Sequence, residues 1–307
     1  MNVLVTGATG VIGRQAIPRL LQAGHEVAGV ARSAAAASWL RAAGATPVQV
    51  DLFDPATVAS VVTDADAVVH LATAIPPLAR MRRPGAWHTN DRLRTHATRN
   101  LVDAAIAAGA EVFVQESISF VYADGGAAWL DESATVDPPV AATRSALEAE
   151  AETDRFASAG GRGVALRMAR LYGPGRASAE LADLALARRA FVVGHGGNYV
   201  SSLHVEDAGT AVAAALTVPS GIYNVGDDAP VAALRWTTSL AAALGAPPPR
   251  RLPVWVARRL LGSVADLLAV SQRVSNQAFH RAAGWEPRYP SVVAGWPTVG
   301  TERRRSA

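Results

Sequence analysis

A glycine-rich stretch near the start of the chain has the residue types and spacing that bind a phosphate group. It reads TGATGVIG, residues 6–13, and it lies between a short apolar run and a helical pattern. Gly7 would permit the tight turn, Gly10 would let the backbone approach a pyrophosphate, and Gly13 would allow close helix–strand packing. The pyrophosphate would then bind the free N–H groups at the helix N-terminus. The residues expected to contact a dinucleotide here are Gly7, Thr9, Gly10, Val11, Ile12 and Gly13.

The residues after the second apolar run indicate which dinucleotide is bound. That run, 26–31, is followed by Arg32 and Ser33, where an NAD site normally carries a carboxylate for the ribose 2′-OH. A guanidinium pairs with a 2′-phosphate, so we expect NADP(H) in preference to NAD(H). The alternative is an exposed arginine at a strand end. The other expected cofactor contacts are Asp51 and Leu52 beside the adenine, and Leu71, Ala72 and Thr73 along the middle of the cofactor.

Six apolar runs alternate with helical patterns over the first 172 residues, including a long helix expected at 88–108. This alternation predicts an α/β fold of the Rossmann type, a doubly wound parallel sheet with helices on both faces. After Gly173 the rhythm changes, and we expect a smaller, mostly helical substrate lobe over the carboxyl ends of the strands. The expected division is a dinucleotide-binding domain at 1–172 and 197–225, a substrate lobe at 173–196 and 226–300, and a basic tail at 301–307.

The composition excludes several kinds of chemistry. The chain of 307 residues contains no cysteine, so disulfides and thiolate nucleophiles are absent. All 29 basic residues are arginine, which excludes Schiff bases and lysine acids. The net charge is only 29 − 26 = +3. The His, Asp and Glu residues do not have the spacing of metal ligands, and no apolar run is long enough to span a membrane. We therefore expect no metal, no nucleic-acid partner and no membrane, and a cytoplasmic protein because no signal peptide is apparent.

Beyond the glycine loop, a series of motifs resembles the extended short-chain dehydrogenases/reductases, in particular the NAD-dependent epimerase/dehydratase family. The motifs occur in the family's order over about residues 1–297: TGATGVIG, VDL, VVHLAT, FVYA, RLYGPG, SLHVEDAGTAV, GIYNVGDD and AAGWEPRYPS. The resemblance implies a Rossmann fold, a nicotinamide cofactor and a C-terminal substrate lobe. It also implies chemistry by a Ser or Thr, a Tyr and a Lys, in which the tyrosine exchanges a proton with the substrate while a hydride moves.

The positions of this catalytic trio are apolar in the present sequence. The family pattern is Tyr-x-x-Ser-Lys-x-x-x-Glu, and Ser145 and Glu150 of AATRSALEAE set its register. The tyrosine position is then Ala142 and the lysine position Ala146. Counting back four residues from the tyrosine of FVYA places Ile118 at the Ser or Thr position. We infer an atypical member that lacks the Tyr-x-x-x-Lys pair, whose proton transfer is absent or supplied elsewhere.

Two hydroxyls near the expected nicotinamide are candidates for the missing proton chemistry. Tyr122 could act as a general acid or be an ordinary structural tyrosine, and Ser117 could orient a substrate oxygen or bond the backbone. Glu116 could be a base with a raised pKa, or a carboxylate held by hydrogen bonds. Asp207 is expected to N-cap a helix at 208–216, and the loop 73–87 is a candidate lid or anion contact.

We predict an NADP(H)-binding oxidoreductase, a reductase acting on a small, fairly apolar substrate. One alternative is a cyclase, isomerase or lyase that uses the same pocket without net redox chemistry. The other is a protein that senses a dinucleotide and catalyses nothing, because all three catalytic positions are replaced while the glycine loop is retained. A homodimer is left open.

Overall fold

A computed structural model describes the chain except residues 78–79, 82, 84, 139, 141–142 and 307. Its centre is a parallel sheet of seven strands in the order β12-β7-β5-β4-β1-β2-β3. The strands are β1 (Asn2–Thr6), β2 (Glu26–Val30), β3 (Thr46–Val48), β4 (Ala67–His70), β5 (Val112–Ile118), β7 (Arg162–Met168) and β12 (Gly221–Val225). The strand order reverses between β1 and β4, and ligands of open α/β sheets bind at such a point.

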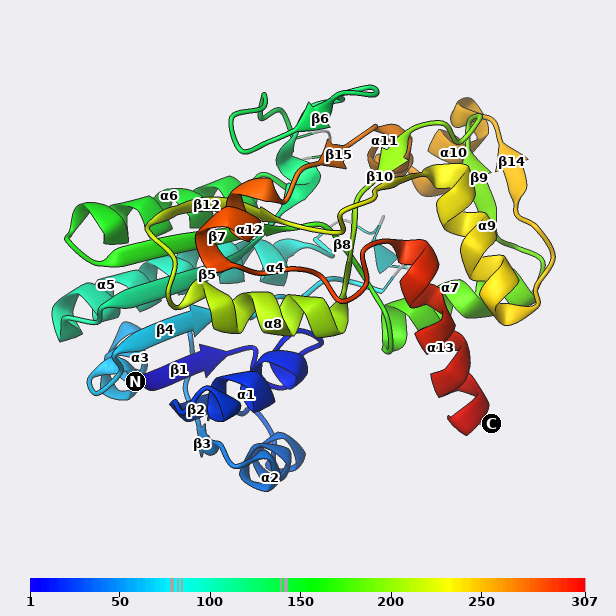
Figure 1. Cartoon of the computed structure of the whole chain (residues 1–307). Coiled ribbons are helices and arrows are strands. Elements are labelled where there is room, and N and C mark those ends of the chain that lie inside the picture. Colours follow the sequence, from blue (N-terminus) through cyan, green and yellow to red (C-terminus); the bar gives the residue numbers. More distant parts are fainter. Residues whose placement is uncertain (78–79, 82, 84, 139, 141–142, 307) are drawn as a thin grey trace.

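Helices cover both faces of this sheet, so the predicted Rossmann fold is confirmed (Figure 1). One face packs against α1 (Gly13–Gln22), α2 (Ala34–Ala43), α8 (Val205–Ala215) and α12 (Gln277–Ala283). The other packs against α3 (Pro55–Val62), α5 (Thr98–Ala108) and α6 (Ser145–Ser158). The central strands are mostly apolar because side chains on both faces are buried, and the buried polar residues among them lie towards the carboxyl ends of β1, β4, β5 and β7.

The long helix expected at 88–108 contains one wide turn. It consists of α4 (His88–Arg92), a π-helical turn (Leu93–Ala97) and α5. The carbonyl of Leu93 accepts hydrogen bonds from His70 Nε2 and Thr98 Oγ1, each at 3.2 Å. Burial lowers the pKa of His70 to about 4, so the ring is neutral, and its Nδ1 accepts from Thr6 Oγ1 at 2.5 Å. The turn is therefore tied to β4 by side chains that no helical periodicity reveals.

The remaining elements form the smaller lobe, on the right in Figure 1, and the segments leading to it. A cluster of Tyr172, Trp236 and Trp296 lies at its centre. The helices are α7 (Arg176–Leu186), α9 (Ala233–Leu244), α10 (Val254–Leu261), α11 (Val264–Ala269) and α13 (Val292–Ser306). The short strands are β6 (Trp129–Leu130), β8 (Arg170–Tyr172), β9 (Phe191–Val193), β10 (Tyr199–Val200), β11 (Ser202–His204), β13 (Val231–Ala232), β14 (Arg250–Leu252) and β15 (Arg273–Val274). Although α12 falls within 226–300, it packs against the main sheet.

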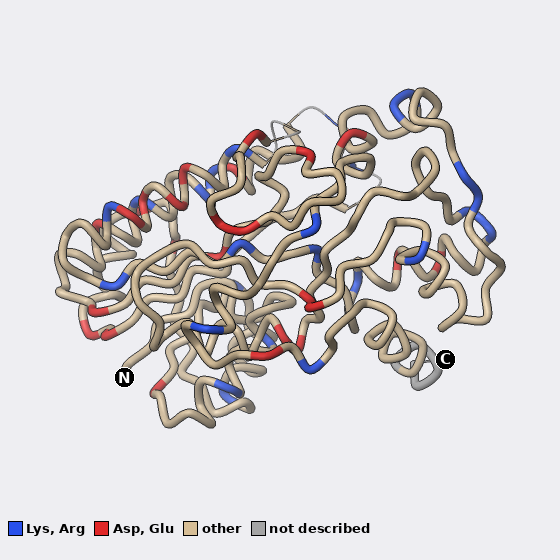
Figure 2. The backbone as a smooth tube through the Cα atoms, turned by 45° about the horizontal axis from the view of Figure 1, so that its top comes forward, with Lys and Arg blue, Asp and Glu red and all other residues tan. Residues whose placement is uncertain are grey.

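Basic and acidic residues occur along both α5 and α6 (Figure 2). Arg155 binds Asp103 at 2.6 Å and Glu152 at 2.7 Å, and Arg99 binds Glu152 at 3.0 Å. Such exposed pairs contribute little to stability.

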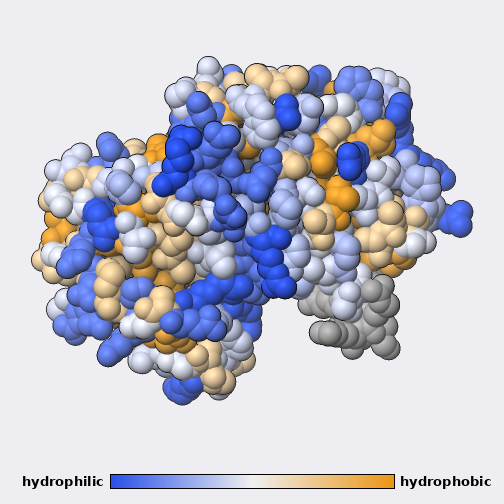
Figure 3. All heavy atoms as spheres, in the orientation of Figure 1, coloured by the Kyte–Doolittle hydropathy of each residue, from blue (hydrophilic) through white to orange (hydrophobic). Residues whose placement is uncertain are grey.

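Figure 3 shows hydrophobic side chains at the surface of the smaller lobe. None of the described helices combines the length and apolar character needed to cross a bilayer.

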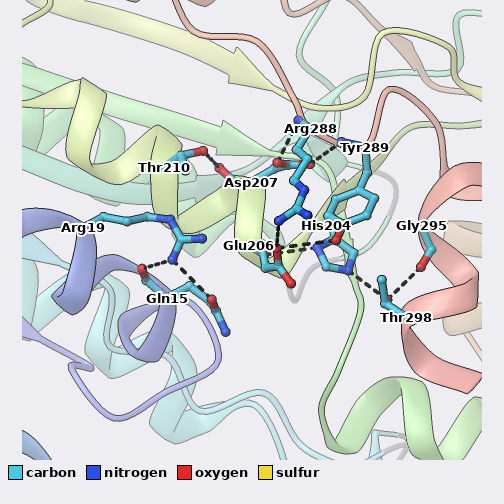
Figure 4. Close-up of polar contacts among 10 residues, drawn as sticks. All are labelled: Gln15, Arg19, His204, Glu206, Asp207, Thr210, Arg288, Tyr289, Gly295 and Thr298. Atoms are coloured by element: carbon cyan, nitrogen blue, oxygen red, sulfur yellow. Dashed lines mark hydrogen bonds and ion pairs between the residues drawn. The ribbon is translucent and has the colours of Figure 1, made fainter. Parts of the chain in front are cut away.

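Asp207 does not cap a helix, so that prediction was wrong. The helix begins earlier than expected, and its N-cap is His204, whose Nδ1 accepts from the N–H of Glu206 at 3.3 Å. The Asp207 carboxylate instead accepts the backbone N–H groups of Arg288 and Tyr289, at 2.9 and 3.0 Å (Figure 4). It therefore holds the C-terminal segment against the main sheet domain.

A second buried carboxylate joins the two parts of the molecule and predicts a pH dependence. Asp227, just after β12, accepts the N–H groups of Ser202 and Val292. Burial raises the pKa of Asp227 from 3.8 to about 7. A carboxyl whose pKa rises on folding favours the folded state when protonated, so the free energy of unfolding should fall from about pH 4 to about pH 7.

Replacing Asp227 with Asn should remove this dependence. The melting temperature of the variant minus that of the parent chain should be larger at pH 8 than at pH 5, because only the parent has a buried carboxylate that ionises over this range. Each unit of pKa shift corresponds to about 1.4 kcal/mol in the free energy of unfolding. Thermal unfolding at both pH values measures the effect. The exposed neighbour Asp228→Asn should change the difference less. Equal shifts at pH 5 and pH 8 for Asp227→Asn would contradict the assignment.

Candidate cofactor and active site

The glycine loop after β1 has the shape that a pyrophosphate requires. Gly7 has a φ of +65°, and a Cβ there would lie 2.5 Å from the carbonyl oxygen of Leu71 on the adjacent strand end. A Cβ on Gly13 would lie 2.3 Å from the carbonyl oxygen of Gly7. Gly10 closes the turn by donating to Gly7 O at 2.8 Å, and Gly10 and Val11 are exposed. This cradle fits a dinucleotide, because N–H groups at a helix N-terminus bind phosphate. Those of residues 14–16 already donate to Gly10 O and Ile12 O, so the N–H groups that precede them are the ones expected to bind the pyrophosphate.

The residues expected at the adenosine end surround the start of α2. Arg32 and Ser33 are exposed after β2, and Ser33 Oγ caps α2 by accepting from Ala36 N at 3.2 Å. The N-terminus of a helix favours an anion, so it would assist Arg32. Asp51 accepts from Phe53 N at 2.9 Å. The other expected contacts are Leu52, half-buried near Asp51, and, after β4, Leu71 (buried), Ala72 (half-buried) and Thr73 (exposed).

Two of the three positions matched to the family's catalytic trio lie within the described residues. Ile118 is half-buried at the carboxyl end of β5, and Ala146 is fully buried on α6. Ala142 lies outside the described residues. The assignment of these positions to Ser or Thr, Lys and Tyr therefore stays a prediction.

Ser117 and Tyr122 belong to one buried hydrogen-bond network. Ser117 Oγ donates to Glu150 at 2.6 Å, and Tyr122 Oη donates to Asn224 at 2.8 Å. Between them, Arg167 binds the Glu150 carboxylate twice, at 2.8 and 2.7 Å, and donates to Tyr122 Oη at 2.9 Å. Burial alone would lower the pKa of Arg167, but its bonds and attraction to Glu150 raise it overall. The network thus joins β5, α6, β7 and β12.

These contacts favour the structural alternative for both hydroxyls. Burial raises the pKa of Tyr122, although Arg167 opposes the effect. A tyrosine acid that works near neutral pH needs the opposite shift. Neither Ser117 nor Tyr122 is measurably exposed to solvent. Their role in proton transfer stays a prediction, and the geometry gives them a positioning role through Glu150.

Glu116 is also held within the protein. It accepts two bonds from Arg94 Nη2, at 3.0 and 2.7 Å, and both side chains are buried. Burial raises the pKa of Glu116, while Arg94 lowers it in part. The hydrogen-bonded alternative therefore describes this carboxylate.

Sequence reasoning missed Arg94, Arg167 and Arg170 as important groups. Each is a charged residue within or beside an apolar stretch, which is the one signal that could have singled it out. The partners of Arg94 and Arg167 lie 22 and 17 positions away, and no local pattern connects them.

Two further expectations concern metals and the loop 73–87. Among the side chains that the structure describes, no three His, Cys, Asp or Glu form a group able to hold a metal ion. The loop 73–87 includes 78–79, 82 and 84, which lie outside the described residues. Its visible contacts include a bond from Trp87 Nε1 to Met81 O at 3.1 Å.

Comparison with known proteins identifies the family. Residues 3–226 match the NAD dependent epimerase/dehydratase family. The chain belongs to this family. A curated relative, the 3-diazoavenalumate denitrifying reductase of a Streptomyces species, is 41% identical over 302 residues, covering 95% of this chain and 97% of its own.

Solved structures agree on the fold. The UDP-glucose 4-epimerase of Thermus thermophilus in complex with NAD has a TM-score of 0.81 at 24% identity over all of both chains. A human epimerase family protein with NADPH has a TM-score of 0.77 at 21% identity, over 98% of this chain and 99% of its own. The family match supports a nicotinamide dinucleotide cofactor, and the curated relative supports an oxidoreductase.

The buried network predicts a large effect at Glu150. Glu150→Gln would leave the buried Arg167 without its counterion, which typically costs about 3–5 kcal/mol in the free energy of unfolding. Denaturant unfolding measures the loss. Glu148→Gln, an exposed carboxylate on the same helix, should change stability by less than about 0.5 kcal/mol. Similar values for the two variants would show that the Glu150–Arg167 pair does not stabilise the fold.

Proposed function

We propose that this chain is an NADPH-dependent reductase whose substrate accepts a hydride without a proton from the protein. The observation that carries the proposal is the loss of the proton-transfer groups beside a retained cofactor loop. Ile118, Ala142 and Ala146 replace the expected hydroxyls and lysine, and the chain has no lysine. This loss would slow the reduction of a carbonyl substrate, because the carbonyl oxygen must be protonated as hydride adds.

A diazonium carbon is an acceptor that fits these constraints. When a diazonium carbon takes up hydride, the C–N bonding pair leaves with dinitrogen, and one C–H bond replaces one C–N bond. The cationic substrate becomes neutral as the reduced nicotinamide becomes cationic, so charge balances without a proton. The extensive similarity to a denitrifying reductase of a diazo compound supports this substrate class.

In this proposal the protein binds, orients and excludes water. Gly7, Gly10 and Gly13 hold the pyrophosphate, and Arg32 with Ser33 binds the 2′-phosphate. The bound nicotinamide would supply the hydride. The half-buried Ile118 at the end of β5 presents an apolar side chain where the family places a hydroxyl. An apolar wall protects a reactive diazo group from hydrolysis.

Isotope labelling tests the reaction. An aromatic diazonium carboxylate incubated with the protein and NADPH deuterated at the transferable C4 position should release dinitrogen and gain carbon-bound deuterium. The same reaction in D2O with unlabelled NADPH should give no deuterium at that carbon. Deuterium from solvent alone would contradict hydride transfer. Tight NADPH binding with no turnover would favour the dinucleotide-sensing alternative, and product formation without NADPH oxidation would favour an isomerase or lyase.

The cofactor preference depends on Arg32. Arg32→Gln should weaken NADPH binding roughly 10–100-fold, the range of a charge-assisted hydrogen bond, and leave NADH binding within about twofold. Calorimetry with both cofactors measures the two affinities. Arg41→Gln, an exposed arginine at the far end of α2, is the matched control. An unchanged NADPH affinity in Arg32→Gln would place the 2′-phosphate elsewhere.

A further inference from the structure

A small pocket lies directly beyond the strand ends that carry the candidate active site. Ser119 and Phe120, which follow Ile118, form one wall, and Arg170 forms another. Ile118 pairs in register with Met168 of β7, so Arg170 lies only two residues beyond the neighbouring strand end. Elements of the smaller lobe close the pocket, including Tyr199 on β10. The pocket is therefore where a substrate would lie across the two lobes.

The guanidinium of Arg170 has no counterion within the described part of the chain. Its Nε is buried without a hydrogen-bond partner, and no ion pair involves this residue. The group lies 5.6 Å from the ring centres of both Phe120 and Trp236. Burial lowers the pKa of Arg170 to about 10, so it still carries its charge at neutral pH. The half-buried Arg170 differs in this from the two buried arginines, because Arg94 and Arg167 each bind a carboxylate at 2.7 Å.

Several other polar side chains around the pocket already bind the backbone. Asn198 donates to the carbonyls of Leu268 and Val270, and Gln272 donates to Tyr122 O at 2.6 Å. Ser201 Oγ donates to Gln272 O and accepts from Val274 N. Arg170 is the one cation among the described residues that line the pocket, and a buried guanidinium nitrogen without a partner is costly.

The walls and size of the pocket limit what it binds. Leucine and valine side chains from α11 and the residue after it line one side, and Phe120 lines another. The free volume is about 10 Å³, about the space that one water molecule needs, so the pocket admits only the end of a ligand. A compact anion at the end of an apolar molecule fits this space, and a planar carboxylate matches the fork of a guanidinium.

We propose that Arg170 binds the carboxylate end of the substrate in this pocket and so directs the remainder of an apolar or aromatic acid towards the end of β5. The inference rests on the proposed function for its choice of an organic acid as the substrate. It adds a specificity-determining residue that none of the family's catalytic positions includes.

Binding measurements with a charged and an uncharged ligand test the pocket. The probes are trans-cinnamate and its neutral amide, titrated by calorimetry into the full chain saturated with NADP+. The parent chain should bind cinnamate at least about tenfold more tightly than cinnamamide, because a charged hydrogen bond is lost with the amide. In Arg170→Gln the preference should fall to within about twofold, while cinnamamide and NADP+ affinities stay the same.

Two control variants keep the test decisive. Arg170→Lys retains the charge and should keep part of the preference. Arg235→Gln removes an exposed arginine from α9, next to Trp236, and should keep all of it. Retention of the full preference in Arg170→Gln would overturn the proposal. Binding of UDP-glucose but not cinnamate by the parent chain would also overturn it, because the anion would then be a diphosphate.

Failure of this inference can be told apart from failure of the proposed reaction. The binding assay needs no turnover, and the isotope assay needs no knowledge of Arg170. Cinnamate binding through Arg170 without dinitrogen release would retain the carboxylate site and reject the reaction. Dinitrogen release that is unaffected in kcat and KM by Arg170→Gln would retain the reaction and reject the site.

Discussion

The ion pair between Arg167 and Glu150 sets the geometry of the active-site region. It lies between β7 and α6, where two charges are stable only if each is paired and fully hydrogen-bonded. Ser117 and Tyr122 supply the additional bonds. The hydroxyls of Ser117 and Tyr122, close to the candidate site, therefore help to hold α6 against the sheet. These bonds hold both hydroxyls within the protein, where neither is exposed to solvent.

This arrangement is consistent with a reaction that needs only a hydride. In a typical member of the family, as the resemblance implies, a tyrosine and a lysine provide the proton that carbonyl chemistry requires. Here Ala146 is buried in the helix packing and has no polar atom to offer. An acceptor that expels a neutral leaving group does not need that proton. In the proposed reaction, apolar side chains at these positions would help to exclude water from the reactive carbon.

The sequence predicts the features of this protein that depend on local pattern. The turn at Gly7 and Gly13 requires residues without a Cβ, and the parallel strands are mostly apolar because both faces are buried. Other features depend on contacts between distant segments. The π-helical turn is linked to His70 on β4. Arg170 stands out only because its buried Nε has no hydrogen-bond partner in the described part of the chain. Helical periodicity and motif spacing do not predict such contacts. Asp207 shows the same limit, because its short-range motif suggested a cap while its partners lie more than 80 residues away.

The partners of Asp207 have a consequence for how this chain can vary. Its carboxylate holds the C-terminal segment through main-chain N–H groups, which every amino acid except proline possesses. These two bonds do not depend on the side chains at 288 and 289, which add separate contacts of their own to Glu206. Substitutions at these two positions should therefore leave both bonds to the Asp207 carboxylate in place, provided that neither residue becomes proline.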